Sequence, residues 1–266
     1  MERSTLSDSD SIPDSPFAVR ATRSEDIEAI IELCEAVYPD SYTWGPNQLG
    51  SHLEEFPEGQ FVVAEQGSGA IIGMAASLIV DYSKYTLSSK WKDITEWGYF
   101  GTHDPLHGRT LYGAEVMVHP RWQGKGVGKA LYRRREQLAR ERSLRNIRAG
   151  ARISGYHRYA ESLTALEYVD RVVRGELGDP TLSFQLKRGF HVVGVTPRYF
   201  YDPESRDYAA VIEWNNPDAV DGPRVGGEQE PESGNPSSGR GSDPVPPEGQ
   251  GAVKIDSAGP ADGSSE

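Results

Sequence analysis

The sequence has only one cysteine, Cys34, and no long apolar run among its 266 residues. A single cysteine excludes both an internal disulfide and a cluster of thiolate metal ligands. No stretch of about 18 apolar residues is present, and residues 1–16 lack the apolar core of a signal peptide. We therefore expect a soluble, cytoplasmic protein with no membrane partner. Cys34 falls on the apolar stripe of an expected helix, which favours a small core residue over a reactive thiol.

Aromatic residues are missing from both ends of the chain. Residues 1–16 are dominated by Ser, Asp and Pro, and residues 217–266 form an acidic segment rich in Gly, Pro and Ser. Neither segment contains enough apolar surface to offset the entropy that ordering would cost. We expect both to be disordered, which leaves one folded domain at residues 17–216.

Negative charge is concentrated in those two ends. The chain carries a formal charge of -12, but residues 121–158 contain twelve Arg or Lys against two Glu. That basic stretch is where an anionic ligand is expected. An acidic chain whose basic residues are confined to one stretch is not typical of a nucleic-acid-binding protein.

Hydrophobic periodicity predicts the elements of the first half of the domain. Residues 17–21, 60–66 and 70–81 have the pattern of strands, the last two forming a hairpin. Thr22 and Glu25 have the spacing of a capping box, and the helix that follows them ends before Pro39. A shorter helix is expected at residues 48–56. Residues 82–111 are rich in aromatics and lack periodicity, which favours a binding loop or lid.

The second half alternates strands with helices more regularly. Strands are expected at residues 112–118, 147–153, 190–195 and 208–214, and helices at 126–142 and 163–174. A short helix starts at Pro180, is capped by Asp179 and ends before Gly189. The order of elements predicts an α/β (α+β) fold with one central mixed, mostly antiparallel sheet flanked by helices.

The most informative stretch is GAEVMVHPRWQGKGVGKAL at residues 113–131. A strand ends at Pro120, and three alternating glycines, Gly124, Gly126 and Gly128, lead into a helix. Backbone N–H groups of such a turn converge, and the helix N-terminus adds positive charge, which together form a pocket for phosphate oxygens. Lys125 and Lys129 add charge at its rim. The spacing matches neither a Walker loop nor a dinucleotide fingerprint.

This stretch resembles the acetyl-CoA signature of the GNAT superfamily, Gln/Arg-x-x-Gly-x-Gly/Ala. The matching residues are Gln123, Gly124, Lys125, Gly126, Val127 and Gly128. Segments such as GYHRY, VVRGEL and GDPTLSFQLKRGF resemble a branch whose members are often fused to a carbon–nitrogen hydrolase domain. We expect no such domain here, because residues 217–266 have no folding pattern.

The resemblance implies a GNAT fold and an N-acyltransferase that uses acetyl-CoA as co-substrate and no metal. In that fold the strand ending at Val118 and the strand near residues 148–153 splay apart. The pantetheine arm then lies between them and pairs with the backbone of Val116, Met117 and Val118. The acceptor is a primary amine of a small molecule, protein or peptide, which attacks the thioester directly. The sequence indicates neither the identity of the acceptor nor the oligomeric state.

Three residues are candidates for the acid–base chemistry. Glu115 lies on the strand that would carry the thioester and is the best candidate for the base, although a salt-bridged structural role is about as plausible. Tyr156 and His157 are the alternatives, since they, like Tyr112, could reach the same cleft, although each could instead be a buried, hydrogen-bonded structural residue. Many family members have a tyrosine proton donor four residues before the Gly-Phe glycine, but Gln185 stands there in this chain. That departure leaves open a catalytically silent, acyl-CoA-binding regulatory module, or a transferase of a longer acyl group.

Overall fold

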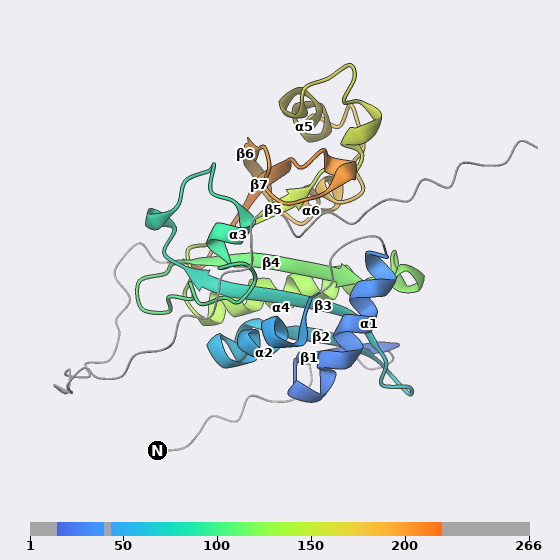
Figure 1. Ribbon diagram of the computed structural model, residues 1–266, viewed down its shortest axis with the longest axis vertical. Coiled ribbons are helices and arrows are strands. Elements are labelled where there is room, and N and C mark those ends of the chain that lie inside the picture. The colour runs from blue at the N-terminus through green and yellow to red at the C-terminus, as the bar shows by residue number, and fades with distance from the viewer. Residues whose placement is uncertain (1–14, 40–43, 220–266) are drawn as a thin grey trace, which may run out of the picture.

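A computed structural model of the protein describes residues 15–39 and 44–219. The expected disorder of residues 1–14 and 220–266 therefore concerns segments outside the described residues. In the described part, no helix combines the length and apolarity needed to span a membrane. The architecture is a seven-stranded sheet with helices on both faces, as the sequence predicts (Figure 1).

The strands are arranged in the order β1-β2-β3-β4-β5-β7-β6. All neighbouring strands pair antiparallel except β4 and β5, which are parallel. The fold class expected from the sequence is confirmed. The strand bounds are β1 Phe17–Ala21, β2 Phe61–Glu65, β3 Ile71–Val80, β4 Thr110–Val118, β5 Asn146–Arg152, β6 His191–Thr196 and β7 Ala209–Asn215.

The helices enclose two separate cores, one on each face of the sheet. On one face α1, α2 and α3 pack over the middle strands, while α4, α5 and α6 bury a larger apolar cluster on the other. Figure 1 shows α1 and α4 on opposite sides of β3 and β4. The helix bounds are α1 Ile27–Val37, α2 Pro46–Glu55, α3 Trp91–Ile94, α4 Val127–Glu141, α5 Ala165–Val173 and α6 Leu182–Leu186. Cys34 is buried in the first core, as expected.

The start of the first helix differs from its prediction. Thr22 and Glu25 do not form the expected capping box. Instead Asp26 accepts the backbone N–H of Arg23 at 2.8 Å and a two-pronged ion pair from Arg20 at 2.6 and 2.7 Å. Asp26 can serve both groups because it is buried at the start of the helical segment, where a carboxylate also compensates the helix dipole.

Residues 82–111 form an ordered cover over one end of the sheet. They contain α3 and a tight turn in which Glu96, Trp97, Gly98 and Phe100 have positive φ angles. The buried ring of His52 holds this turn through a 2.7 Å hydrogen bond to the Gly98 carbonyl. The segment therefore packs against α2, and its structure depends on contacts that are distant in the sequence.

Candidate functional site

A β-bulge in β4 sets the orientation of the candidate base. Ala76 of β3 lies opposite Glu115, whereas Ser77 lies opposite Gly113, so Ala114 is an extra residue on β4. The alternation of faces changes across it, because Tyr112 and Met117 belong to the same core although five residues separate them. Bulges re-aim side chains in this way. Here the bulge directs Glu115 toward the end of α1.

Arg135 of α4 occupies the space behind the bulge and is fully buried. Its Nη2 donates to the carbonyl oxygens of Ala76 at 3.0 Å and Glu115 at 2.7 Å, and its Nε donates to Ser77 Oγ at 2.9 Å. A Cβ on Gly113 would lie 2.7 Å from its Nη1, so a larger residue there would push the guanidinium out of this position. Burial lowers the pKa of Arg135. The guanidinium stabilises the irregular backbone that carries Glu115.

The gap between β4 and β5 opens immediately before the bulge. The two strands pair only from Thr110 to Tyr112, opposite residues 146–148, and β5 continues alone with β7 to Arg152. Beyond Tyr112, the edge of β4 that faces β5 has no strand partner. The splayed arrangement implied by the sequence resemblance is therefore present.

Glu115 is half-buried at this gap, and its carboxylate contacts one group of its own strand and one from the end of α1. Its Oε1 accepts the N–H of Val116 at 3.0 Å and the hydroxyl of Tyr38 at 3.3 Å. Burial raises the pKa of Glu115, and the Val116 N–H together with Arg152 opposes that rise. A carboxylate held in this way can accept a proton from a bound amine more readily than an exposed glutamate.

Tyr38 and Arg152 complete the surroundings of Glu115. Arg152 lies on β5, and its guanidinium is 5.3 Å from the ring of Tyr38, across the gap. Asp202 binds Arg152 at two 2.8 Å contacts and holds the guanidinium in place. Burial also raises the pKa of Tyr38, so its hydroxyl stays protonated and acts as a donor. Tyr38 follows α1 and precedes Pro39. Its sequence context indicates only the end of a helix, so the sequence alone does not predict that Tyr38 belongs to a site.

Tyr156 and His157 lie in a different cluster from Glu115. The Tyr156 hydroxyl donates to the Leu163 carbonyl at 3.1 Å, and His157 Nδ1 is 2.7 Å from the Ser154 carbonyl. In the described part of the chain, no hydrogen bond or ring contact joins either side chain to Glu115. Each side chain therefore has a contact with the backbone that stabilises the local structure, and the catalytic roles of Tyr156 and His157 remain predictions.

The loop at residues 123–128 contains two glycines with left-handed backbone and leads into α4. Gly124 and Gly126 have φ angles of 74° and 91°, and α4 begins at Val127 with Gly126 as its N-cap. The first helical hydrogen bond runs from Ala130 N–H to the Gly126 carbonyl at 3.0 Å. The N–H groups of Val127, Gly128 and Lys129 therefore precede the helical ladder, which leaves donors for an anion. Lys125 lies over the Trp122 ring, 5.0 Å from its centroid, at the rim of the loop.

Gln185 is buried on α6 and contacts Tyr132 of α4, a residue that the sequence did not single out. Its Nε2 is 2.8 Å from the Tyr132 hydroxyl oxygen, whereas its Oε1 has no hydrogen-bond partner. Tyr132 lies four residues after Gly128, which places the two on one face of α4. That spacing is a signal from which Tyr132 could have been found.

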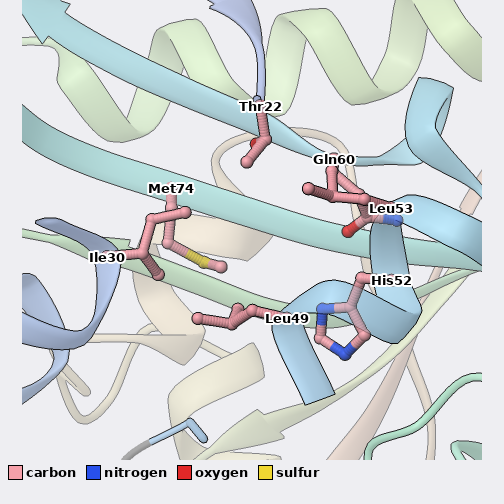
Figure 2. A pocket seen from close by; sticks show the side chains of 7 residues that line it. All are labelled: Thr22, Ile30, Leu49, His52, Leu53, Gln60 and Met74. Atoms are coloured by element: carbon pink, nitrogen blue, oxygen red, sulfur yellow. The ribbon is translucent and has the colours of Figure 1, made fainter. Parts of the chain in front are cut away.

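A small pocket on the other side of the sheet is apolar and structural. Figure 2 shows its lining, which comes from α1, α2 and β3 and from Thr22 and Gln60, the residues next to β1 and β2. His52 borders it, but burial lowers the pKa of His52 to about 4, so the ring stays neutral and serves to anchor the Gly98 carbonyl. Gln60 Nε2 donates to the carbonyls of Phe56 and Ser77. These polar groups are used in holding the fold. No group of three or more His, Cys, Asp or Glu side chains could hold a metal among the described residues.

The gap between the splayed strands and the glycine loop at a helix N-terminus are the two features that the sequence resemblance implies. A model of the acetyltransferase (GNAT) family matches residues 27–159. The chain belongs to the acetyltransferase (GNAT) family.

Two proteins of Bacillus subtilis (strain 168) are similar in sequence. "Uncharacterized N-acetyltransferase YkwB" is 34% identical over 204 residues, which is 75% of this chain and 89% of the relative. "Probable hydrolase YhcX" is 43% identical over 203 residues, which is 76% of this chain. The match spans only 39% of YhcX. A hydrolase-named relative is consistent with the branch that the sequence resembles.

Two solved structures share the fold at low sequence identity. The loading GNATL domain of CurA from Lyngbya majuscula gives a TM-score of 0.65 at 19% identity, covering 75% of this chain and 97% of that one. The GphF GNAT-like decarboxylase in complex with isobutyryl-CoA gives a TM-score of 0.61 at 20% identity, covering 74% and 98%. These similarities establish the fold alone.

Proposed function

We propose that the protein transfers an acetyl group from acetyl-CoA to a primary amine by direct attack in a ternary complex. The observation that carries the proposal is the continuity of β4. Its bulge presents Glu115 in the gap, and its end leads directly into the phosphate loop at residues 123–128. A thioester anchored by its pyrophosphate at that loop and extended along β4 would reach the candidate base.

The phosphate loop would hold the coenzyme by its backbone. The N–H groups of Val127, Gly128 and Lys129 and the helix N-terminus favour pyrophosphate oxygens, and Lys125 adds charge nearby. The unpaired edge of β4 at Val116, Met117 and Val118 would pair with the amides of the pantetheine arm. Acetyl-CoA brings the activated acyl group, and the protein supplies position and proton transfer.

Glu115 would act as the general base. Its pKa is raised by burial, and Tyr38 and Val116 fix the position of one carboxylate oxygen. It would take a proton from the ammonium before the attack, or from the neutral amine as it attacks, directly or through a water. Because the Val116 N–H is used by Glu115 itself and the Met117 N–H faces β3, the N–H of Val118 is the better donor to the thioester oxygen as negative charge develops on it.

The acceptor would be an amine-bearing small molecule, protein or peptide. The gap is bordered by the cover at residues 82–111, where Trp91 Nε1 donates to the Ala114 carbonyl at 3.1 Å. This contact joins the cover to the bulge, so the cover's shape and the position of Glu115 depend on each other. Acceptor choice is therefore expected to reside in residues 82–111.

A panel of amines tests the proposal. The purified protein is mixed with acetyl-CoA and, separately, with small amines, polyamines, lysine peptides and peptides with free N-termini, while free thiol is followed. We expect thiol release that depends on one class of amine, with an acetylated product of matching mass. Tight acetyl-CoA binding without amine-dependent release from any donor would contradict the proposal and favour a silent acyl-CoA-binding module. Release with propionyl-CoA or butyryl-CoA but not acetyl-CoA would instead indicate a transferase of longer acyl groups.

A further inference from the structure

Tyr132 and Gln185 form a buried polar pair between the phosphate loop and the bulge. Tyr132 and Gln185 are each only 5% exposed. The Tyr132 ring packs edge-on against Phe184 and Phe190, at centroid distances of 5.5 and 5.6 Å. Along α4, Tyr132 lies one turn after Gly128 and one turn before Arg135, which binds the Glu115 carbonyl. A group bound between loop and bulge would therefore pass this hydroxyl.

The hydrogen bonds of the pair are incomplete. Gln185 Nε2 donates to the phenol oxygen, so the phenol proton is left without an acceptor among the residues that the structure describes. Gln185 Oε1 also lacks a partner. Exchanging the amide oxygen and nitrogen would give the phenol proton an acceptor but leave the amide N–H₂ unpaired. In both assignments the pair keeps an unused polar group in a buried place, which is costly unless a ligand uses it.

We propose that Tyr132 donates its proton to the sulfur of CoA when the thioester breaks, with Gln185 as the positioning residue. The inference rests on the proposed function. The amine nitrogen forms a bond to the acyl carbon and gives a proton to Glu115. The carbon–sulfur bond then breaks, sulfur takes the bonding electron pair, and the phenol proton moves to sulfur. The products are an amide and a thiol, and solvent then takes the extra proton from Glu115 and returns one to Tyr132.

The surroundings of Tyr132 suit a proton donor. Burial raises the pKa of Tyr132, so the phenol is protonated before the reaction. The Arg135 guanidinium lies 5.8 Å from its ring and favours the phenolate, as does the hydrogen bond from Gln185. The phenol that many family members place at the Gln185 position is thus supplied from the neighbouring helix. This explains how a glutamine can stand there in an active enzyme.

The ionisation of the bound CoA thiol gives a test that needs no acceptor. The ultraviolet absorbance of the thiolate is followed as a function of pH for CoA bound to the wild-type protein and to Tyr132→Phe. A phenol that donates to sulfur stabilises the thiolate. Tyr132→Phe should therefore raise the pKa of the bound thiol, which means an acid dissociation constant about tenfold smaller. Phe190→Leu, which alters packing on the same ring but removes no hydroxyl, should leave it unchanged. Identical thiol pKa values in wild type and Tyr132→Phe, at equal CoA affinity, would overturn the inference.

Turnover gives a second, independent test with the accepted amine. Tyr132→Phe should lower kcat about 10–100-fold, toward the small end of general-acid effects because a thiolate is a tolerable leaving group. It should also remove the alkaline fall of the pH profile. Gln185→Leu should cause a smaller loss in the same direction, and Gln185→Glu should not recover it, because a carboxylate cannot donate to the phenol oxygen. If wild-type protein acetylates an amine and Tyr132→Phe keeps its kcat and alkaline limb, the inference fails while the proposed function stands. If wild-type protein acetylates nothing, the proposed function fails, and the thiol titration still decides whether Tyr132 contacts sulfur.

Discussion

The phosphate loop and the surroundings of Glu115 lie along one strand and its continuation but are built differently. The loop uses the backbone of six consecutive residues, 123–128, whose glycines permit the required φ angles. The Glu115 site uses side chains from α1, β4, α4 and β5 and from the segment after β6. A backbone site tolerates variation in side chains, whereas a side-chain site depends on the whole fold. Coenzyme binding and acyl-transfer chemistry should therefore respond to different substitutions.

Glu115→Gln should give the largest difference between an effect on turnover and an effect on acetyl-CoA binding. The amide keeps the shape of the side chain but cannot accept the amine proton, so kcat should fall about 10²–10⁴-fold. Acetyl-CoA affinity should be unchanged, because the phosphate loop is untouched. Steady-state kinetics together with calorimetry check both expectations.

The pH profile sharpens this test. The raised pKa of Glu115 means that wild-type turnover should fall as pH decreases through a value above that of an ordinary glutamate. The deficit of Glu115→Gln should shrink as pH rises, because more of the amine is then neutral. Wild-type kcat and an unchanged profile in this variant would exclude Glu115 and direct attention to Tyr156 and His157.

Arg135→Met should destabilise the region around the bulge. The substitution leaves the carbonyls of Ala76 and Glu115 without their buried donor, at a cost of about 3–5 kcal/mol. For a domain of this size the Tm should fall by roughly 6–20 °C. Arg134→Met is the matched control, since Arg134 pairs with exposed Glu141 and should cost less than about 1 kcal/mol. Equal Tm values for the two variants would show that the bulge does not need the guanidinium.

Low pH should lower the free energy of unfolding through protonation of His52, which holds the segment that borders the Glu115 site. The folded protein lowers the pKa of His52 from 6.5 to about 4, so the neutral form is favoured by folding. The resulting stability is present above pH 6.5 and is lost as pH falls toward 4, by about 2–3 kcal/mol at pH 4.5.

Urea unfolding at pH 7 and pH 4.5 measures that loss. His52→Phe should lose correspondingly less than wild type over this interval, and His107→Gln, at an exposed position, should behave like wild type. His103, whose pKa burial also lowers to about 4, remains in all three proteins, so the difference isolates His52. Equal losses in His52→Phe and wild type would contradict the account.

Most of the fold could be predicted because its signals are local. The periodicity of α1 and α4, the Gly-Ser-Gly hairpin between β2 and β3, and the cap that Asp179 provides to Thr181 and Leu182 each lie within a few residues. The start of α1 was mispredicted because a local Thr-Glu pattern competes with Arg20, whose guanidinium draws Asp26 into a buried ion pair. The structure of residues 82–111 could not be predicted, because their turn is fixed by a hydrogen bond from His52 of α2 and not by a local pattern.

The glycine turn at residues 123–128 and the helix start after it could be predicted for the same reason, whereas most of the surroundings of Glu115 could not. The bulge at Ala114 depends on the pairing of β3 with β4, which no window of β4 alone reveals. Tyr38 and Arg152 meet only when α1 and β5 are placed across the gap. Arg135 had a usable signal, because it follows Leu131 by four residues on the apolar stripe of α4. An arginine on that stripe indicates a buried partner.

Acetyl-CoA binding to Gly126→Val tests the central claim most directly. The new Cβ would crowd the point where phosphate oxygens must approach, so affinity should fall at least ~10-fold, roughly 1.4 kcal/mol. Gly175→Val is the matched control, since Gly175 has a similarly positive φ of 74° and open space around it, outside the loop. Calorimetry on both variants, each shown to be folded, should find the loss in Gly126→Val alone. Unchanged acetyl-CoA affinity in folded Gly126→Val would contradict the assignment of residues 123–128 as the coenzyme site.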